Sequence, residues 1–345
     1  MSKTLRFNRR TMSLALAAST AAMLAGVSLP ASSAFAQAVT ADDWKKLLEL
    51  AAEAKKLGIN LPQITAPASG ASNFADIVPA VLDFINHLEE AESTPAGKAS
   101  AAAIEKLEQR ASDLLHNINA KEKHPRQGMG GAPSGFLASL VAGPANAANG
   151  DDPTYDKWRQ GYLDLFDTCV VRPERQSTVN FYVDTLTATK NRSIYEQVEE
   201  AVCVPWYFIG AIHALETSFN FRDHLHNGDP ISARTFHVPA GRPKQWLPPS
   251  DWVSSAKDAL EYEKYTNHTD WNLAKLLYRL EKYNGTRSRL EHGINTPYLW
   301  SFSNHYTSGK FVADNVWSSS AVSQQPGTAV MIKELVKRQL IVPVA

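Results

Sequence analysis

The segment from Val204 to Asn220 contains the residue of this sequence best placed for acid–base chemistry. Apolar residues recur there at helical steps, which predicts a core-facing stripe made of Phe208, Ile209, Ile212, Leu215 and Phe219. Glu216 lies at the edge of this stripe, so its carboxyl group is expected in apolar surroundings. Burial disfavours the ionised form of a carboxyl group and raises its pKa. A glutamic acid kept protonated near neutral pH is the general acid that glycosidic bond cleavage requires; the alternative is a glutamate at a helix end that points to water.

The elements that must position Glu216 are predicted to be mainly helical. From residue 154 onward the chain is dense in aromatic residues, as a well-filled core would be, and its apolar residues keep helical spacing. The exception follows the Glu216 helix, where Asn227-Gly228 is a strong hairpin signal between predicted strands at 222–226 and 232–238. We therefore expect a mainly α fold with one small β-hairpin directly after Glu216.

The first 36 residues are typical of a secretory signal peptide. A basic start precedes a short apolar run, and Ala34-Phe35-Ala36 forms a small-residue cleavage site before Gln37. Arg9–Leu14 also resembles a twin-arginine export signal, with ordinary secretion as the alternative. No later segment approaches the ~20 apolar residues of a membrane span. The sequence thus predicts an exported protein, periplasmic or extracellular, without a transmembrane segment.

The remaining chain divides by composition into three parts. Residues 37–125 carry amphipathic helical runs in an Ala-rich background and show no catalytic cluster, so a small bundle, a spacer and an adaptor are all compatible. Residues 126–153 are rich in Gly, Pro and Ala, which is typical of a linker. Residues 154–345 form the aromatic-rich domain that contains Glu216.

Charge and cysteine content bear on three questions: a nucleic-acid partner, a disulfide and a cysteine metal site. The chain has 35 Lys and Arg residues against 35 Asp and Glu residues, and this balance argues against a nucleic-acid partner. Its two cysteines, Cys169 and Cys203, allow one disulfide in an oxidising compartment, which would close a loop of about 35 residues and contribute roughly 3–4 kcal/mol. The alternative is two free thiols. No cysteine spacing typical of a metal site is present.

Short motifs resemble those of lysozyme-like enzymes. Residues 216–220, Glu-Thr-Ser-Phe-Asn, resemble the Glu-Ser-x-Phe-Asn signature of soluble lytic transglycosylases, and Tyr283-Asn284-Gly285 is similar to their cleft-lining Tyr-Asn-Ala-Gly segment. Residues 200–335 also resemble bacterial and phage "lysozyme family" proteins, through the segments 224–230, 237–243 and 323–325. The resemblance implies a lysozyme-like C-terminal domain, a cut at the β-1,4 link between N-acetylmuramic acid and N-acetylglucosamine, and Glu216 as its general acid.

A comparison with phage-type lysozymes adds two candidate residues. Those enzymes place an aspartate and then a threonine after the acid glutamate, and Asp229 and Thr235 stand at the matching interval from each other. Asp229 would stabilise positive charge or activate water, and Thr235 would hold that water; the alternative is ordinary turn chemistry. A second carboxylate favours hydrolysis, since lytic transglycosylases work with one acid and their Gly-Leu-Met-Gln segment is missing here. Transglycosylation stays open.

The histidines offer a competing enzyme class. His224 and His226 would share one strand face, and with Asp229, His237 and either His292 or His305 they could build a zinc site of a peptidoglycan amidase. The alternative, which we favour, is that these histidines form hydrogen bonds in a polar cleft, with His226 among the substrate-binding residues. We therefore expect neither a metal nor a cofactor.

Aromatic rings supply the other substrate-binding candidates. An apolar ring suits the face of a pyranose, and most of the aromatic residues will instead fill the core; Trp300 and Tyr306, in the polar segment 295–310, are the better cleft candidates. With Tyr283 and Asn284 they complete the predicted glycan-binding set. Peptidoglycan or a related exported glycan is the predicted partner, and a non-enzymatic glycan- or partner-binding protein with the same cleft is the rival hypothesis. The sequence does not fix an oligomeric state.

Overall fold

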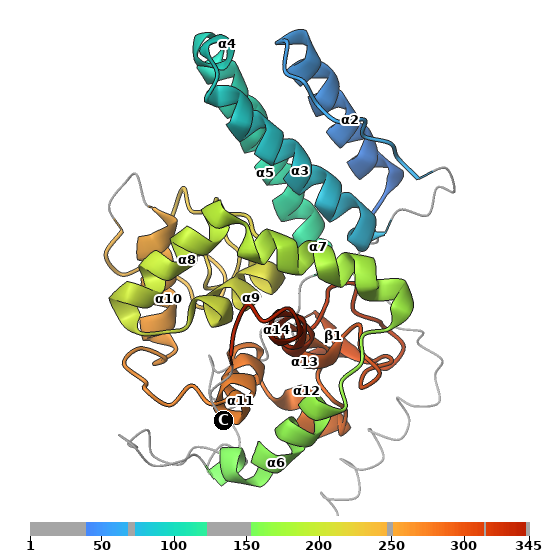
Figure 1. Cartoon of the computed structure of the whole chain (residues 1–345), viewed down its shortest axis with the longest axis vertical. Helices are drawn as coiled ribbons and strands as arrows, with labels where there is room; N and C mark the ends of the chain where they lie inside the picture. Colours follow the sequence, from blue (N-terminus) through green and yellow to red (C-terminus); the bar gives the residue numbers. More distant parts are fainter. Residues whose placement is uncertain (1–38, 68–72, 123–152, 247–250, 314, 343–345) are drawn as a thin grey trace, which may run out of the picture. The chain divides into compact units, whose positions relative to one another are not determined.

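Three long helices build the N-terminal part of the chain. They are α2 (Ala41–Lys56), α3 (Phe74–Glu92) and α5 (Ala101–Glu122), and the short helix α4 (Pro95–Ala99) joins the last two. In Figure 1, α3 and α5 run side by side, and α5 also packs on α2. Their apolar stripes form the shared core, with fully buried side chains at Leu47, Ile77, Val81, Leu88 and Leu115. The predicted helical N-terminal region is therefore confirmed.

The computed structural model describes residues 39–67, 73–122, 153–246, 251–313 and 315–342. The predicted signal peptide lies outside these ranges, as does the predicted linker except for its last residue, Pro153, which begins helix α6. In the described ranges no helix has both the length and the apolar character needed to cross a membrane.

The second part of the described chain is also mainly helical, as its spacing predicts. Helix α9 lies at its centre and contacts α5, α7, α8, α11 and α14. Every residue of α9 except Tyr207 is buried, because the helix is apolar on nearly all sides and other helices surround it. The surrounding elements are α6 (Pro153–Asp167), a 3-10 turn (Pro173–Arg175), α7 (Gln176–Thr187), α8 (Thr189–Val202), α10 (Trp252–Tyr262), α11 (Leu273–Asn284), α12 (Arg287–His292), α13 (Pro297–Trp300) and α14 (Thr328–Lys337).

The small sheet lies later in the chain than predicted. Strands β1 (Lys310–Ala313) and β2 (Val316–Ser318) pair antiparallel, with Lys310 opposite Ser318. The predicted hairpin at 222–238 is wrong, because this segment is a loop with a single antiparallel bridge between Asp223 and Pro230. Side chains satisfy its backbone instead of a ladder: the Asp229 carboxylate accepts hydrogen bonds from the backbone N–H groups of residues 236 and 237.

Buried polar contacts join α5 to the chain around α9 and β1. The Lys310 ammonium, 2% exposed, donates to the Glu122 carboxylate at 2.8 Å and to the Glu122 carbonyl at 3.0 Å. The Ser112 hydroxyl donates to Asn220 at 2.9 Å. The N-terminal helices and the C-terminal helices accordingly belong to one compact unit, residues 36–345.

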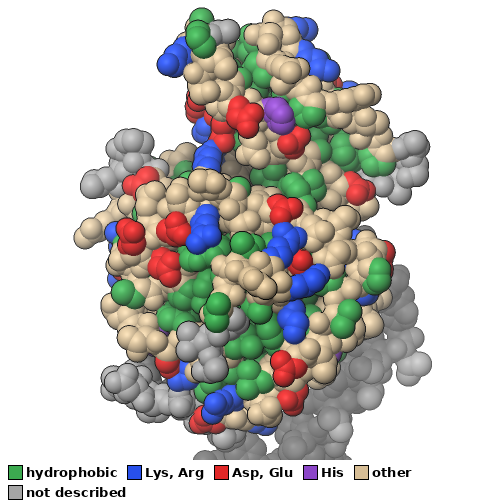
Figure 2. All heavy atoms as spheres, in the orientation of Figure 1, with side chains coloured by type: hydrophobic (Ala, Val, Ile, Leu, Met, Phe, Trp, Pro, Cys, Tyr) green, Lys and Arg blue, Asp and Glu red, His purple; other side chains and the backbone are tan. Residues whose placement is uncertain are grey.

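The predicted disulfide is absent, since Cys169 and Cys203 are both free thiols. Cys169 is buried just after α6, and burial raises the pKa of its thiol. Cys203 is exposed and ends α8 in the left-handed conformation, with φ 57°. The surface agrees with the balanced composition, because on the face in Figure 2 basic and acidic side chains are interspersed.

Candidate functional site

Glu216 occupies the last turn of the buried helix α9. The helix begins at Trp206, with Pro205 as its N-terminal cap residue, and it ends at Thr217. Ser218 and Phe219 then both adopt left-handed backbone angles, with φ of 52° and 63°, so the chain turns sharply just beyond the glutamate. The Glu216 side chain is 2% exposed, which confirms its predicted burial.

The Glu216 carboxyl group is contacted from α13. The Tyr298 hydroxyl donates a hydrogen bond to Oε1 of Glu216 at 3.1 Å, and the Tyr298 side chain is itself fully buried. A hydrogen bond in buried surroundings is electrostatically stronger than one in water and fixes the orientation of both partners. Tyr298 therefore holds the carboxyl group in one orientation.

The backbone at the end of α9 is held from α5 and from the segment before α14. The Asn119 amide donates to the Glu216 carbonyl at 2.6 Å, and its own oxygen accepts from the Ser218 hydroxyl at 2.7 Å. The Gln325 amide donates to the Leu215 carbonyl at 3.2 Å. These bonds satisfy carbonyl groups that a helix end leaves without an intrahelical partner, and they cover the helix end that carries Glu216.

His213 lies one turn before Glu216 and is also fully buried. Its Nδ1 lies 2.9 Å from the Tyr195 hydroxyl, and its Nε2 lies 3.2 Å from the Asn220 carbonyl. Burial lowers the pKa of His213 to about 3 and outweighs the hydrogen bond to the Asn220 carbonyl, which by itself raises the pKa. The imidazole is thus neutral at neutral pH and acts as a structural part of the α9 core.

Asp229 organises the loop that follows α9. Its carboxylate accepts hydrogen bonds from the backbone N–H groups of Phe236 and His237 at 2.8 and 2.9 Å, and from the Asn227 amide at 3.0 Å. The His237 ring nitrogen lies 2.6 Å from its other oxygen. Burial by itself raises the pKa of Asp229, yet the hydrogen bonds from His237 and Phe236 outweigh it and leave the pKa lowered. The carboxylate is ionised and engaged inside its own loop.

Thr235 is likewise used within the same loop. Its hydroxyl donates to the Pro239 carbonyl at 2.5 Å and accepts from the Arg242 N–H at 2.9 Å, and its side chain is buried. These hydrogen bonds of Asp229 and Thr235 join them to neighbours between residues 224 and 242, and none of the bonds named here reaches Glu216. The predicted turn chemistry accounts for both side chains as they stand.

The histidines of this region bind different partners rather than a common one. His226 is buried and lies 2.8 Å from the Asp258 carboxylate, which Arg242 also binds through two nitrogens at 2.8 Å. His224 lies 2.6 Å from the Ser255 hydroxyl. His292 stacks on Trp317, His305 lies near the Thr168 hydroxyl, and His237 binds Asp229. Within the described ranges these side chains form no group that could share a metal ion, and His226 is a buried partner of Asp258.

Tyr283 and Asn284 end helix α11 beside the same loop. The Tyr283 hydroxyl donates to the Leu225 carbonyl at 2.8 Å, which ties α11 to the segment after Glu216. Asn284 is 2% exposed, and its Oδ1 has no hydrogen-bond partner among the described residues. A buried amide oxygen without a partner is a destabilising feature, and a water or ligand donor would satisfy it. Asn284 thus keeps its candidate binding role.

The two predicted sugar-stacking rings lie in the core. Trp300 is fully buried and packs edge-to-face on His305, with ring centroids 5.6 Å apart. Tyr306 is 3% exposed, and its hydroxyl donates to the Gly309 carbonyl at 3.2 Å. A ring without an exposed face offers no platform to a pyranose, so the prediction of stacking by these two residues is wrong for this conformation.

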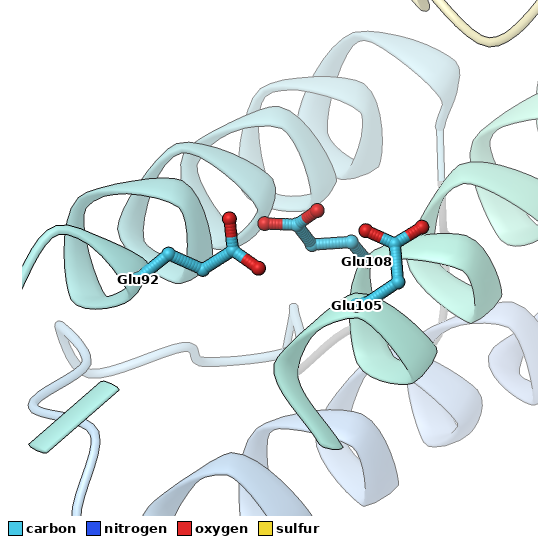
Figure 3. A group of neighbouring side chains, drawn as sticks. All are labelled: Glu92, Glu105 and Glu108. Carbon is cyan, nitrogen blue, oxygen red and sulfur yellow. The ribbon is translucent and has the colours of Figure 1, made fainter. Parts of the chain in front are cut away.

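Sequence reasoning missed a group of three carboxylates on the N-terminal helices. Glu92 ends α3, and Glu105 and Glu108 lie one turn apart on α5; Figure 3 shows the three carboxylates facing one another. The available signal was Glu108, a charged residue next to Leu107 in the predicted apolar stripe of its helix. The sequence alone does not reveal that α3 packs beside α5, and it is this packing that brings Glu92 to the other two.

Comparison with known proteins gives no relative. No protein-family model matches the chain, and neither a curated protein nor a solved structure matches it. Functional arguments therefore rest on the residues of the chain itself.

Proposed function

We propose that this protein cleaves the glycan strands of peptidoglycan at the β-1,4 bond between N-acetylmuramic acid and N-acetylglucosamine, with Glu216 as the general acid. One observation carries the proposal: a glutamic acid sits at the end of a central buried helix, 2% exposed, with a buried tyrosine hydroxyl 3.1 Å from its carboxyl oxygen. Burial of a glutamic acid, with a tyrosine hydroxyl that orients its carboxyl group, is an environment in which it can serve as a proton donor.

In this proposal Glu216 protonates the leaving glycosidic oxygen while the sugar ring develops positive charge. Tyr298 orients the carboxyl group during that transfer, and the Asn119 amide holds the end of α9 through the Glu216 carbonyl. Because Glu216 is nearly inaccessible in this conformation, a substrate reaches it only when the groups that cover it move. The proposal therefore includes an opening of the chain around the end of α9.

Transglycosylation of the same bond is the second candidate. Hydrolysis needs a water that a second carboxylate activates, whereas transglycosylation uses a hydroxyl group of the substrate itself. The observation that favours the second candidate is the engagement of both Asp229 and Thr235 inside their own loop. Asp229 is then occupied with its own loop, and Glu216 is the remaining carboxylic acid of the predicted catalytic set.

A non-enzymatic binding protein is the third candidate. It is favoured by the burial of Glu216, which keeps the carboxyl group away from a substrate in this conformation. In this case the carboxyl group of Glu216 would be a structural hydrogen-bond acceptor of Tyr298.

Mass spectrometry of purified peptidoglycan after incubation with the protein separates these candidates. Reducing N-acetylmuramic acid ends identify hydrolysis, and 1,6-anhydro ends identify transglycosylation. Freed stem peptides that disappear with EDTA would overturn the proposal in favour of an amidase. Co-sedimentation with peptidoglycan without any product would favour the binding protein.

A further inference from the structure

Glu92, Glu105 and Glu108 bring three carboxylates together between α3 and α5. One oxygen from each carboxylate lies within 4.8 Å of the corresponding oxygen of the other two. Figure 3 shows the Glu92 carboxylate reaching from the end of its helix towards those of Glu105 and Glu108. Three like charges at this separation repel one another unless a cation lies among them.

One carboxylate oxygen of this group is buried and has no hydrogen-bond partner among the described residues. Glu108 is 6% exposed, and its Oε1 makes no hydrogen bond with any described residue. Burial, and after it the charges of Glu92 and Glu89, raise the pKa of Glu108 to about 7. A buried carboxylate oxygen without a partner is strongly unfavourable, and a bound cation is one way to satisfy it.

The negative charge of the three carboxylates is only partly compensated by nearby basic side chains, which favours a divalent cation. Arg222 donates from one guanidinium nitrogen to Glu105 at 3.0 Å and to Glu108 at 3.2 Å, and these bonds use one oxygen of each carboxylate. With all three carboxylates ionised, one guanidinium leaves two negative charges uncompensated. The neighbouring Glu89 pairs with Lys190, so this lysine serves a different carboxylate.

The group also has a route to solvent. A pocket borders Glu108 and is lined by polar side chains of both helices and of the loop after Glu216, among them Asn86, Ser112, Asn220 and Arg222. Glu105 and Glu92 are exposed and partly exposed. A cation can therefore reach the site while it keeps the waters that would complete its coordination.

We propose that Glu92, Glu105 and Glu108 bind a hard divalent cation, and that the cation is calcium. Carboxylate oxygens are the ligands of such ions, and calcium takes them at about 2.3–2.6 Å in flexible geometry. A point within about 2.8 Å of all three oxygens exists when they are at most 4.8 Å apart, so small movements of the side chains bring them to calcium distance. The cation links the end of α3 to α5, and Arg222 extends this link to the loop after Glu216. This inference is independent of the proposed catalytic activity.

Thermal unfolding and calorimetric titration with calcium chloride test the proposal. Against EDTA, millimolar calcium is expected to raise the melting temperature by a few degrees, and titration should show about one site per chain. Glu108→Gln and Glu92→Gln each remove one anionic ligand and should weaken calcium binding by at least about tenfold. Glu90→Gln is the matched control, because Glu90 is exposed on the same helix and lies outside the group.

Several outcomes decide the question. An equal response to magnesium would overturn the assignment to calcium and leave only a hard divalent site. The same rise in melting temperature with sodium chloride at matched ionic strength would overturn the site, because screening alone would explain it. The proposal also fails if titration detects no calcium binding to the folded wild-type protein, or if Glu108→Gln and Glu92→Gln bind calcium as the Glu90→Gln control does. Should one ligand variant not fold, the other decides the test.

Discussion

Acid should destabilise this protein through His213, the buried histidine of α9. In the folded protein burial lowers the pKa of its imidazole to about 3, whereas in the unfolded chain the ordinary value of 6.5 applies. Between these two values the unfolded chain binds a proton that the folded protein excludes. The free energy of unfolding must therefore fall as the pH drops below 6.5.

The size of this effect follows from the two pKa values. Each pH unit well inside the window contributes about 1.4 kcal/mol, so a change from pH 7.5 to pH 5 removes about 2 kcal/mol through His213 alone. The loss would approach about 5 kcal/mol near pH 3, where the folded imidazole also begins to bind a proton. Carboxylates add their own pH dependence, so the contribution of His213 must be isolated by substitution.

Urea denaturation of wild type and His213→Gln at both pH values is the appropriate assay. The variant loses native hydrogen bonds and will be less stable at pH 7.5, but glutamine does not titrate. Its free energy of unfolding should therefore fall by about 2 kcal/mol less than that of wild type between pH 7.5 and pH 5. Equal losses in the two proteins, within about 0.5 kcal/mol, would refute the reasoning, because they would mean that His213 binds its proton equally well in both states.

Two further predictions concern buried polar contacts. Glu122→Gln leaves the Lys310 ammonium buried beside a neutral group and should lower the free energy of unfolding by about 3–5 kcal/mol. The double variant Glu122→Leu with Lys310→Met should recover most of that loss. A loss below about 1 kcal/mol for Glu122→Gln in urea denaturation would contradict this. Tyr298→Phe removes the donor to Glu216 and should shift the alkaline limb of the pH–rate profile for glycan cleavage to higher pH by about one unit, because a donated hydrogen bond favours the ionised carboxylate. An unmoved limb would show that Tyr298 does not act on the reacting acid.

The helices could be predicted from the sequence because their stripes are regular. Apolar residues at helical spacing between Ile77 and Leu88 fall inside α3, and of the two N-cap residue types at 250 and 251 it is Asp251 that caps α10. Nothing in the sequence provides a means of rejecting the hairpin that we expected at 222–238. Asn227-Gly228 is a turn signal, yet the side chain of Asp229 competes with strand pairing for the backbone N–H groups, and local propensity does not report that competition.

The site was predictable to the extent that it depends on one helix. Glu216 is buried because α9 is apolar around its circumference, and that property can be read from sequence. The burial of Trp300 depends on how the short helix α13 packs on α11 and α14, which the spacing of residues along the chain does not reveal. Asn119 reaches the end of α9 across a sequence separation of 97 residues. Contacts of this kind arise only from the tertiary fold.

The central claim is that the Glu216 carboxyl group donates the proton in glycan cleavage. The most direct test compares peptidoglycan digestion by wild type, Glu216→Gln and Glu200→Gln, with products quantified by mass spectrometry and folding checked by circular dichroism. Glu200 is the matched control because it is an exposed glutamate on the neighbouring helix α8. The account predicts that Glu216→Gln folds and loses turnover by at least about 100-fold while Glu200→Gln cleaves like wild type. Turnover by folded Glu216→Gln at the wild-type rate would contradict the account.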